Sequence, residues 1–489
     1  MELSTLMFAS IVLPTLAILT NLIFAKQANL RDTITFAAAL ATFAVVVSIA
    51  LKVGNATTPK FVLFEVFPNI PIGFNVEPLG LLFGLVASGL WIVTHIYAIG
   101  YMRGNGESHH ARFFACFSGA IAAALGIAWS SNMFTLFLFY EILTISTYPL
   151  VVHKGTPEAI RGARTYLGIL LGTSIALQLT AVVWTYAVAN TLDFELGGIL
   201  RDSALPLALV PILLALYAFG IGKAALMPFH RWLPAAMVAP TPVSALLHAV
   251  AVVKAGVFTM LKVGIYIFGI DFLAETGASE WLMWVAAYTI IASSVIAMQQ
   301  DNLKRRLAYS TVSQLSYITL GMALATQMGV LGGGLQIATH AMGKITLFMC
   351  AGAIYVATHK TEISQMTGLG RTMPITFAAF GIAALSIIGL PPLGGSWSKW
   401  YLMVGAADAQ QQIMIAVLMI SSLLNVAYLM PIVGRGFYRD DEANPYNGVR
   451  EAPTFCWLPP AATAFGCLVL FFFAGQIIDF LMPITGAAP

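Results

Sequence analysis

Apolar runs long enough to cross a membrane recur along the whole chain, and they constrain its fold more than any other feature. A transmembrane helix needs about 20 predominantly apolar residues, and fourteen runs meet that requirement. The 489 residues are 59% hydrophobic and only 9% charged, which is typical of a polytopic membrane protein. The sequence therefore predicts an all-α fold of about 14 transmembrane helices. The expected spans are 4–25, 33–53, 78–99, 112–129, 132–152, 165–189, 206–238, 242–268, 281–299, 308–327, 329–356, 374–403, 411–434 and 455–482.

Two of these spans are too long for simple helices, and both carry interior prolines. The span at 206–238 contains Pro228, and the span at 374–403 contains Pro391 and Pro392. Proline removes a backbone donor and clashes with the preceding helical turn. We therefore expect each helix to break at its prolines.

The N-terminal region is expected to hold a retained first span and a small hairpin. Residues 5–25 lack the basic n-region and small-residue cleavage site of a signal peptide, which favours a transmembrane helix that is not removed. Residues 55–77 alternate apolar and polar side chains around Pro68 and Pro71, which predicts a small extramembrane hairpin.

The basic residues separate between the two sides of the expected bundle. Loops on one side carry sixteen of the 24 lysines and arginines, and four more lysines lie inside spans. The other side carries Lys52, Lys60, Arg201 and Lys262. Because cytoplasmic loops are the ones enriched in lysine and arginine, the sixteen are expected in the cytoplasm and both termini on the outer side.

Five charged side chains lie inside stretches that otherwise resemble membrane spans. They are Glu141, Lys223, Lys254, Lys344 and Lys399. A charge at mid-bilayer costs about 2.5–3.5 kcal/mol on the most lenient scale, so it is kept where it faces a partner or a water-filled interior. The set predicts a route for charge through the membrane, because a purely structural scaffold would leave all five unexplained.

Glu141 is the only acidic residue inside any expected span. A buried carboxylate needs a nearby cation to stay charged. Lys223 is the candidate, because the break expected at Pro228 would free backbone carbonyls and admit water beside it. Small movements of Glu141 would then switch Lys223 between holding and releasing a proton. The alternatives are a Glu141 carboxylate that reaches the headgroups and a static ion pair.

Further titratable groups lie in two later spans. His248 and Lys254 are six residues apart and lie on different helix faces, so they would contact different neighbours as successive stations. His340 and Lys344 are four apart and share one face, so one water chain could connect them. Histidine titrates nearest neutral pH and suits a proton relay, while a structural role is as compatible with His248 taken alone.

Lys399 follows the second expected break by only a few residues. Its ammonium group is either the terminal group of the relay or an anchor that snorkels to the membrane interface. Nucleotide-binding loops, zinc-ligand spacings and nucleophile elbows occur in no credible context, and the four cysteines share no metal-binding spacing. The chain is therefore expected to be a transporter component and not an enzyme, with no cofactor and no metal site.

Several sequence blocks resemble the antiporter-like subunits shared by Mrp-type cation/proton antiporters, respiratory complex I and membrane-bound hydrogenases. The blocks cover residues 139–141, 222–234, 239–248, 254–256, 340–344 and 389–399. This resemblance implies two inverted five-helix repeats, each with a broken helix, namely spans seven and twelve. It divides the chain into spans one to three with the hairpin (1–111), a first repeat (112–268), a second repeat (281–434), and a cytoplasmic loop with the last span (435–489).

The resemblance also implies a proton pathway. The pathway would run through Glu141, Lys223, His248, Lys254, His340, Lys344 and Lys399. Lysine at the terminal position, and a chain that ends after span fourteen, are more similar to the D-type subunit of Mrp antiporters. The GlyGlySerTrpSerLysTrp stretch departs from the glycine- and phenylalanine-rich version expected there.

The function implied is that of a proton-translocating subunit of a multisubunit Mrp-type Na⁺/H⁺ antiporter in a bacterial inner membrane. Its expected partners are other subunits, the lipid bilayer and protons, with no nucleic acid. One buried carboxylate offers few oxygen ligands, so Na⁺ is expected to cross elsewhere. The alternatives are a proton pump of a complex I-like or hydrogenase assembly and, less well supported, a partner of a bicarbonate-uptake protein.

Overall fold

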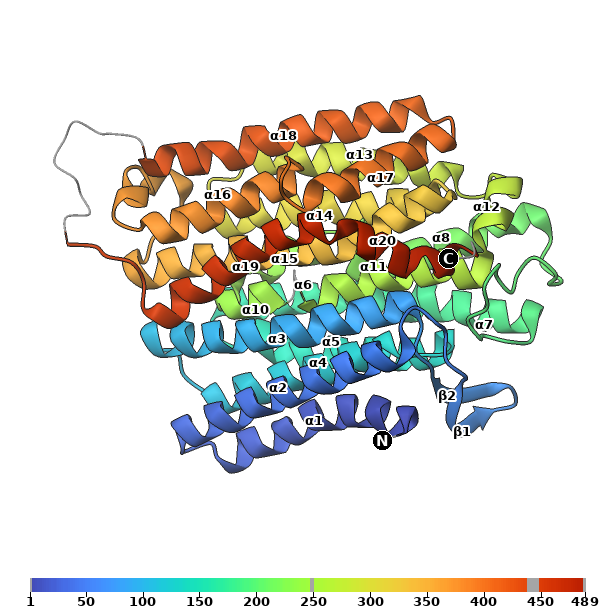
Figure 1. Cartoon of the computed structure of the whole chain (residues 1–489), viewed down its shortest axis with the longest axis horizontal. Coiled ribbons are helices and arrows are strands. Elements are labelled where there is room, and N and C mark those ends of the chain that lie inside the picture. The colour runs from blue at the N-terminus through green and yellow to red at the C-terminus, as the bar shows by residue number, and fades with distance from the viewer. Residues whose placement is uncertain (1, 247–249, 438–447, 487–489) are drawn as a thin grey trace.

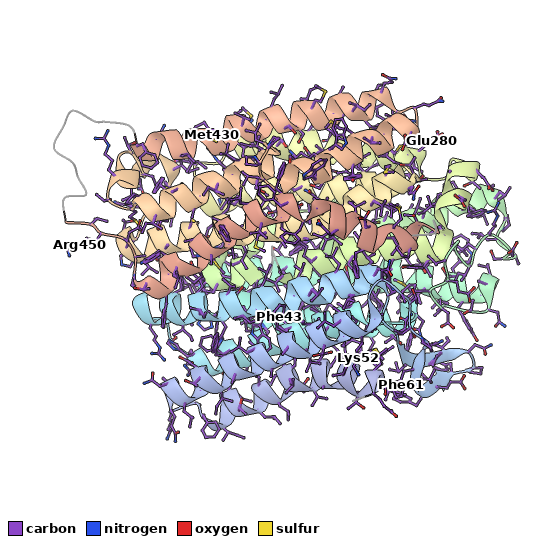
Figure 2. The ribbon with its side chains drawn as sticks, in the orientation of Figure 1. Phe43, Lys52, Phe61, Glu280, Met430 and Arg450 are labelled. Atoms are coloured by element: carbon purple, nitrogen blue, oxygen red, sulfur yellow. The ribbon has the colours of Figure 1, made fainter. Side chains whose placement is uncertain are left out.

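The computed structural model describes residues 2–246, 250–437 and 448–486. Its long helices run side by side in one direction, and a two-stranded sheet lies beside one end of the bundle (Figure 1). Figure 2 shows Arg450 at one end of the bundle and Glu280 and Phe61 at the other. Large apolar side chains face outward along the helices, among them Ile23 and Leu423, so the exterior suits a lipid environment.

The N-terminal region contains three long helices and a β-hairpin. They are α1 (Leu3–Ile23), α2 (Ala28–Val53), β1 (Phe61–Phe67), β2 (Ile70–Phe74) and α3 (Pro78–Gly104). The strands pair antiparallel, and β2 is buried while most of β1 is exposed. The hairpin predicted within residues 55–77 is therefore confirmed.

The middle of the chain contains long helices and several short ones. They are α4 (His110–Ala128), α5 (Met133–Val151), α6 (Pro157–Thr173), a π-helical turn (Ser174–Gln178), α7 (Leu179–Ala189), α8 (Val210–Gly220), α9 (Trp232–Ala235), α10 (Thr241–Ala245), α11 (Val252–Lys262) and α12 (Ile270–Thr276). The span expected at 242–268 is thus divided between α10, α11 and a π-helical segment (Val263–Phe268).

The C-terminal part contains the longest helix and the second broken span. Its helices are α13 (Glu280–Met298), α14 (Leu303–Ala323), α15 (Gln327–Thr358), α16 (Pro374–Ile388), α17 (Gly395–Asp408), α18 (Gln412–Phe437), α19 (Thr454–Phe472) and α20 (Ala474–Leu481). α15 packs against α14, α16, α17 and α19, which places it centrally in this half.

Ten helical segments of the described chain are long and apolar enough to cross a membrane, or eleven if α11 and α12 with the turn between them form one bent span. The expected number of fourteen therefore stays a prediction. The helices α8 and α16 are too short to cross a membrane alone. Each forms one half of a broken span.

Both predicted helix breaks are present, and the first begins earlier than expected. The helix α8 ends at Gly220, eight residues before Pro228, so Lys223 lies inside the break, on a 3₁₀ turn. Gly220 lies against the backbone of Gln178, where a Cβ would stand 2.4 Å from the Gln178 nitrogen. The second break falls where the sequence placed it, and Gly389 begins it at φ 93°.

The position of Lys262 differs from the one expected from the sequence. It was expected on the outer side, but it is the last residue of α11 and fully buried. Its Nζ lies 3.2 Å from Oε1 of Glu77, whose carboxylate also accepts from Tyr266 Oη at 2.7 Å. Glu77 caps α3 by accepting from the backbone nitrogens of Leu79 and Gly80. This cluster joins the start of α3 to the end of α11.

Replacing Lys262→Met is expected to destabilise the protein by about 3–5 kcal/mol, because it leaves the Glu77 carboxylate buried without its cation. Thermal unfolding of the purified protein in detergent measures the loss. Adding Glu77→Gln should recover part of it, and the exposed control Lys26→Met should change little. Equal unfolding temperatures for Lys262→Met and Lys26→Met would contradict the role of the ion pair.

Candidate functional site

The four lysines predicted inside the membrane are buried. Lys223, Lys254 and Lys344 expose none of their surface, and Lys399 exposes 5%. An ammonium group has three N–H donors, and in the absence of water each donor needs an acceptor from the protein. The partners of each amine therefore define what the site can do.

Lys223 is held by α5. Its Nζ donates to the backbone oxygen of Tyr140 at 2.8 Å and to Thr144 Oγ1 at 2.6 Å, and it lies 3.1 Å from the centre of the Tyr140 ring. The Lys223 backbone nitrogen donates to the Tyr140 hydroxyl at 3.2 Å. Trp232 Nε1 donates to the oxygen of Gly222 and satisfies one carbonyl of the break. The broken helix thus presents Lys223 to the inner face of α5.

Glu141 does not form the direct ion pair with Lys223 that was expected. Within the described chain, neither of its buried carboxylate oxygens has a hydrogen-bond partner, and no cation lies within 4 Å of them. Glu141 follows Tyr140 by about 100° around α5 and shares a face with Ile145, which is 62% exposed.

Lys254 and His340 meet at the centre of the bundle. Lys254 Nζ and His340 Nδ1 are 2.7 Å apart, and they come from α11 and α15. The predicted stations on these two spans are therefore in direct contact. His248 lies outside the described residues, so its predicted part in the pathway stays a prediction.

Lys344 lies one helical turn after His340 on α15, as the four-residue spacing predicted. Its Nζ donates to Ser310 Oγ at 2.6 Å and lies 3.4 Å from the oxygen of Leu307. Both acceptors belong to α14. A serine hydroxyl of α14 is thus the partner of a buried amine.

Lys399 points into the protein. Its Nζ donates to the oxygen of Ile388 at 2.8 Å and to Ser422 Oγ at 2.9 Å. Ile388 is the last residue of α16, so the break supplies one of the carbonyls that a helix end leaves unpaired. The snorkelling interpretation of Lys399 does not fit this inward geometry, while its role as a terminal group stays a prediction.

A continuous set of hydrogen bonds joins Lys344 to Lys399. Ser310 Oγ lies 2.8 Å from Tyr428 Oη, which lies 2.5 Å from the side-chain amide of Asn425. In the amide orientation that satisfies both ends, the nitrogen of Asn425 donates to Tyr428 and its oxygen accepts from Lys399 Nζ at 3.1 Å. We call the set from Lys254 to Lys399 the polar axis; its members are Lys254, His340, Lys344, Ser310, Tyr428, Asn425 and Lys399.

A second group of uncharged side chains lies beside the polar axis. Gln336 Nε2 donates to Gln314 Oε1 at 2.9 Å, and Ser398 Oγ donates to Gln336 Oε1 at 2.5 Å. A small pocket lies between these groups and the axis, lined by Gln314, Gln336, Thr339, His340, Ser386, Ile387, Gly395 and Lys399. His340 and Lys399 both line this pocket, whereas Lys344 does not.

Tyr428 and Asn425 are the members that sequence reasoning missed. Both lie in α18, where they are buried between apolar turns. The available signal was Asn425, an amide in a span that is otherwise strongly apolar. Uncharged polar groups are common in such helices, so only the packing of α18 against α13, α14 and α16 identifies their partners.

Two family models match the chain. The model described as "NADH:quinone oxidoreductase/Mrp antiporter, TM" matches residues 130–425, and the model described as "NADH-Ubiquinone oxidoreductase (complex I), chain 5 N-terminus" matches residues 67–114. The first covers more than half of the chain and includes every member of the polar axis except Tyr428.

Named relatives come from both respiratory and antiporter complexes. NADH-quinone oxidoreductase subunit N of Desulforudis audaxviator is 32% identical over 435 residues, which is 84% of each chain. The putative antiporter subunit mnhA2 of Staphylococcus haemolyticus is 29% identical over 88% of this chain and 57% of that protein.

The fold is similar to that of chains in solved membrane complexes. A chain of the Mrp complex from Dietzia sp. DQ12-45-1b superposes with a TM-score of 0.85 at 22% identity, covering 99% of this chain and 97% of that one. A chain of respiratory complex I from Thermus thermophilus superposes with a TM-score of 0.81 at 22% identity, covering 96% and 98%.

Replacing Asn425→Leu is expected to lower the free energy of unfolding by about 1–3 kcal/mol, because it removes the amide between Lys399 and Tyr428 and leaves buried polar groups unpaired. The measurement is thermal unfolding in detergent, with the exposed Gln412→Leu at the start of the same helix as control. If both substitutions have the same small effect, Asn425 does not join these groups.

Proposed function

Because the chain belongs to the NADH:quinone oxidoreductase/Mrp antiporter transmembrane family, we propose that it is the proton-translocating subunit of a multisubunit Mrp-type Na⁺/H⁺ antiporter. The observation that carries this proposal is the polar axis, which places hydrogen-bonded, proton-exchanging groups through the interior of an apolar bundle. Such groups are costly in a membrane, and those that a bundle retains commonly mark a path for ions or protons.

Two parts of the axis, from Lys254 to His340 and from Lys344 to Lys399, can transfer protons by steps over hydrogen-bond distances. Lys254 and His340 share one short contact, so a proton on the amine can pass to a neutral imidazole. The hydroxyls of Ser310 and Tyr428 both donate and accept, so they can carry a proton onward when their hydrogen bonds rearrange. The amide of Asn425 orients the far end of this path toward Lys399.

Protons would enter near Glu141 and Lys223 and leave near Lys399. No hydrogen bond between described side chains joins Lys223 to Lys254 directly, so this step needs water or His248. The close packing of Gly256 on the backbone of Lys223 keeps α11 beside the first break. A movement that brings Glu141 to Lys223 would change how tightly the lysine holds its proton.

The carboxylate of Glu141 is supported in this role by its surroundings. Among the described residues, neither carboxylate oxygen of Glu141 has a hydrogen-bond partner, so a group from outside the chain can supply one. The half-exposed face of α5 around Glu141 can receive another subunit, as expected in a multisubunit complex. A single carboxylate offers too few ligands for Na⁺, so we assign the sodium path to other subunits.

We further propose a bacterial inner membrane with both termini on the outer side. The end of the bundle that carries Arg450 would then face the cytoplasm, in line with the excess of basic residues in loops on that side (Figure 2). In this assignment the chain itself catalyses no chemical reaction.

The second candidate function is that of a proton-pumping subunit in a complex I-like oxidoreductase or a membrane-bound hydrogenase. The subunit N of D. audaxviator, with its similar length and 32% identity, favours it. The same polar axis would serve both functions. Purification of the intact complex separates them, because small antiporter subunits support the first and iron–sulfur subunits support the second.

Replacing Lys223→Ala, Lys254→Ala or Glu141→Ala should each lower proton transport in everted vesicles at least about tenfold, because a positioned proton-transfer group contributes about 10²–10⁴-fold. The exposed control Lys26→Ala should retain the wild-type rate. Blue-native electrophoresis checks that each complex still assembles. Full transport by all three assembled variants would refute the proposed pathway.

A further inference from the structure

A separate polar pocket lies at the basic end of the bundle, away from the polar axis. It has a volume of about 160 Å³ and lies between the ends of α3 and α15, the start of α14, α10 and the loop after α5. Its lining residues include Tyr101, Lys154, Thr241, Lys304 and Tyr355. None of the residues assigned above to proton transfer lines it.

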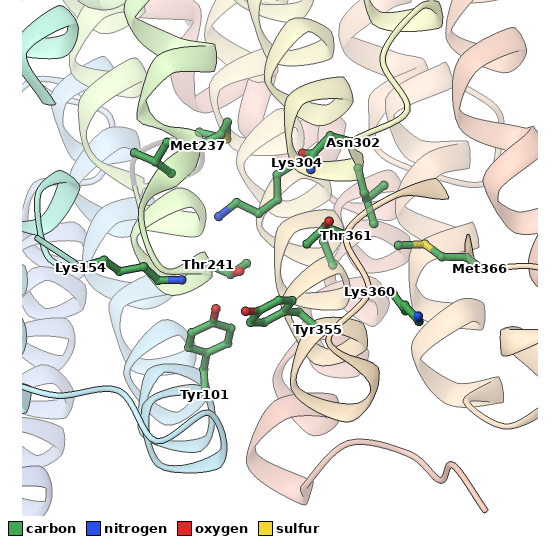
Figure 3. Close-up of a pocket in the computed structure, with 13 residues that line it drawn as sticks. Tyr101, Lys154, Met237, Thr241, Asn302, Lys304, Tyr355, Lys360, Thr361 and Met366 are labelled. Atoms are coloured by element: carbon green, nitrogen blue, oxygen red, sulfur yellow. The ribbon is translucent and has the colours of Figure 1, made fainter. Parts of the chain in front are cut away.

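The polar ends of these five side chains point toward a common centre (Figure 3). The amines of Lys154 and Lys304 approach from two sides, and the hydroxyls of Tyr101, Tyr355 and Thr241 complete the ring. All five can donate a hydrogen bond. None of the described lining residues is acidic, and the Glu107 carboxylate lies outside the lining, 3.8 Å from Lys154 Nζ.

The two amines are only partly satisfied by the protein. Lys304 Nζ donates to the oxygen of Ala239 at 2.6 Å, which leaves two of its three donors for another acceptor. Lys154 Nζ lies 3.8 Å from Glu107, beyond a normal hydrogen bond, and 5.9 Å from the centre of the Tyr355 ring. Each amine therefore retains donors that can reach a ligand.

The charges of this pocket repel one another. Lys304 lies in the first turn of α14, before the expected span at 308–327. Burial, reinforced by the charge of Lys154 and opposed by Glu107, lowers the pKa of Lys304 to about 7. Burial also lowers the pKa of the neighbouring His153 to about 4, so that imidazole adds no charge at neutral pH. An anion between the two lysines would relieve their repulsion.

We propose that this pocket binds a phosphate-type oxyanion, held by Lys154 and Lys304 and oriented by the surrounding hydroxyls. Ammonium and hydroxyl donors at a helix start match the acceptors and charge of such a group. The volume equals about five water molecules at about 30 Å³ each, so it admits a tetrahedral ion or one headgroup phosphate.

A wider cavity borders this inner pocket and would give a ligand access to it. It has a volume of about 800 Å³ and shares Lys154, Met237, Val238 and Asn302 with the inner pocket. Its lining contains both basic residues, such as Arg161 and Arg305, and acidic residues. The charged residues that line the inner pocket are all basic. A free phosphate and the phosphate of an anionic lipid have the same binding chemistry there.

The test uses radioactive sulfate, a dianion that does not titrate near neutral pH, and the purified intact complex in an uncharged detergent. Wild-type complex should bind sulfate saturably and release it to inorganic phosphate. Lys154→Gln and Lys304→Gln should each weaken binding at least about tenfold, as expected for loss of one charge-assisted hydrogen bond. The exposed Lys26→Gln should bind as wild type.

A second arm identifies the source of the phosphate. Sulfate binding is repeated in nanodiscs of phosphatidylcholine alone and in nanodiscs that also contain phosphatidylglycerol. Loss of sulfate binding in the second set, seen equally in the wild-type and Lys26→Gln complexes, assigns the site to a lipid headgroup. Equal binding in both sets assigns it to a free ion.

Absence of saturable sulfate binding in every arm would overturn the proposal. Binding that persists unchanged in both Lys154→Gln and Lys304→Gln would overturn it as well. Because Lys154 is partly exposed, its substitution is the variant least expected to disturb folding. The readout is binding and not transport, so this result is independent of the function proposed above.

Discussion

The hydrogen-bond demand of buried ammonium groups is the constraint on which the rest of this structure depends. Each buried lysine needs acceptors inside a bundle whose backbone carbonyls are mostly used by helices. Lys399 finds one at the open end of α16, and Lys344 finds a serine hydroxyl on α14. Lys223 lies in a break of its own helix and reaches a carbonyl and a hydroxyl on α5. The helix breaks and the polar side chains of neighbouring helices therefore supply hydrogen-bond acceptors to the buried lysines.

The same demand explains why the hydrogen bonds from Lys344 to Lys399 are continuous. A hydroxyl that accepts from an amine still has a proton to donate, so it recruits a further acceptor. Ser310 recruits Tyr428, which meets Asn425, and Asn425 turns its oxygen to Lys399. Satisfying two buried amines in this way creates a path between them. Stability and proton transfer thus rest on the same contacts.

Much of this organisation could be predicted from the sequence, because it depends on local patterns. Apolar runs and prolines predicted the hairpin and both breaks, and four-residue spacing placed His340 and Lys344 on one face. The missed features depend on contacts between distant segments. The helix α8 ends at Gly220, before Pro228, and Lys262 is buried against Glu77. Tyr428 and Asn425 became partners only through the packing of α18.

We propose that buried titratable groups in the two halves of the chain form one polar path. A cryo-electron microscopy map of the intact complex, at a resolution that shows ordered water, tests it most directly. The map should show ordered water between Lys223 and Lys254. It should also show Asn425 in contact with both Tyr428 and Lys399. Apolar side chains closing the space between Lys223 and Lys254 without water, in a complex that transports protons, would contradict it.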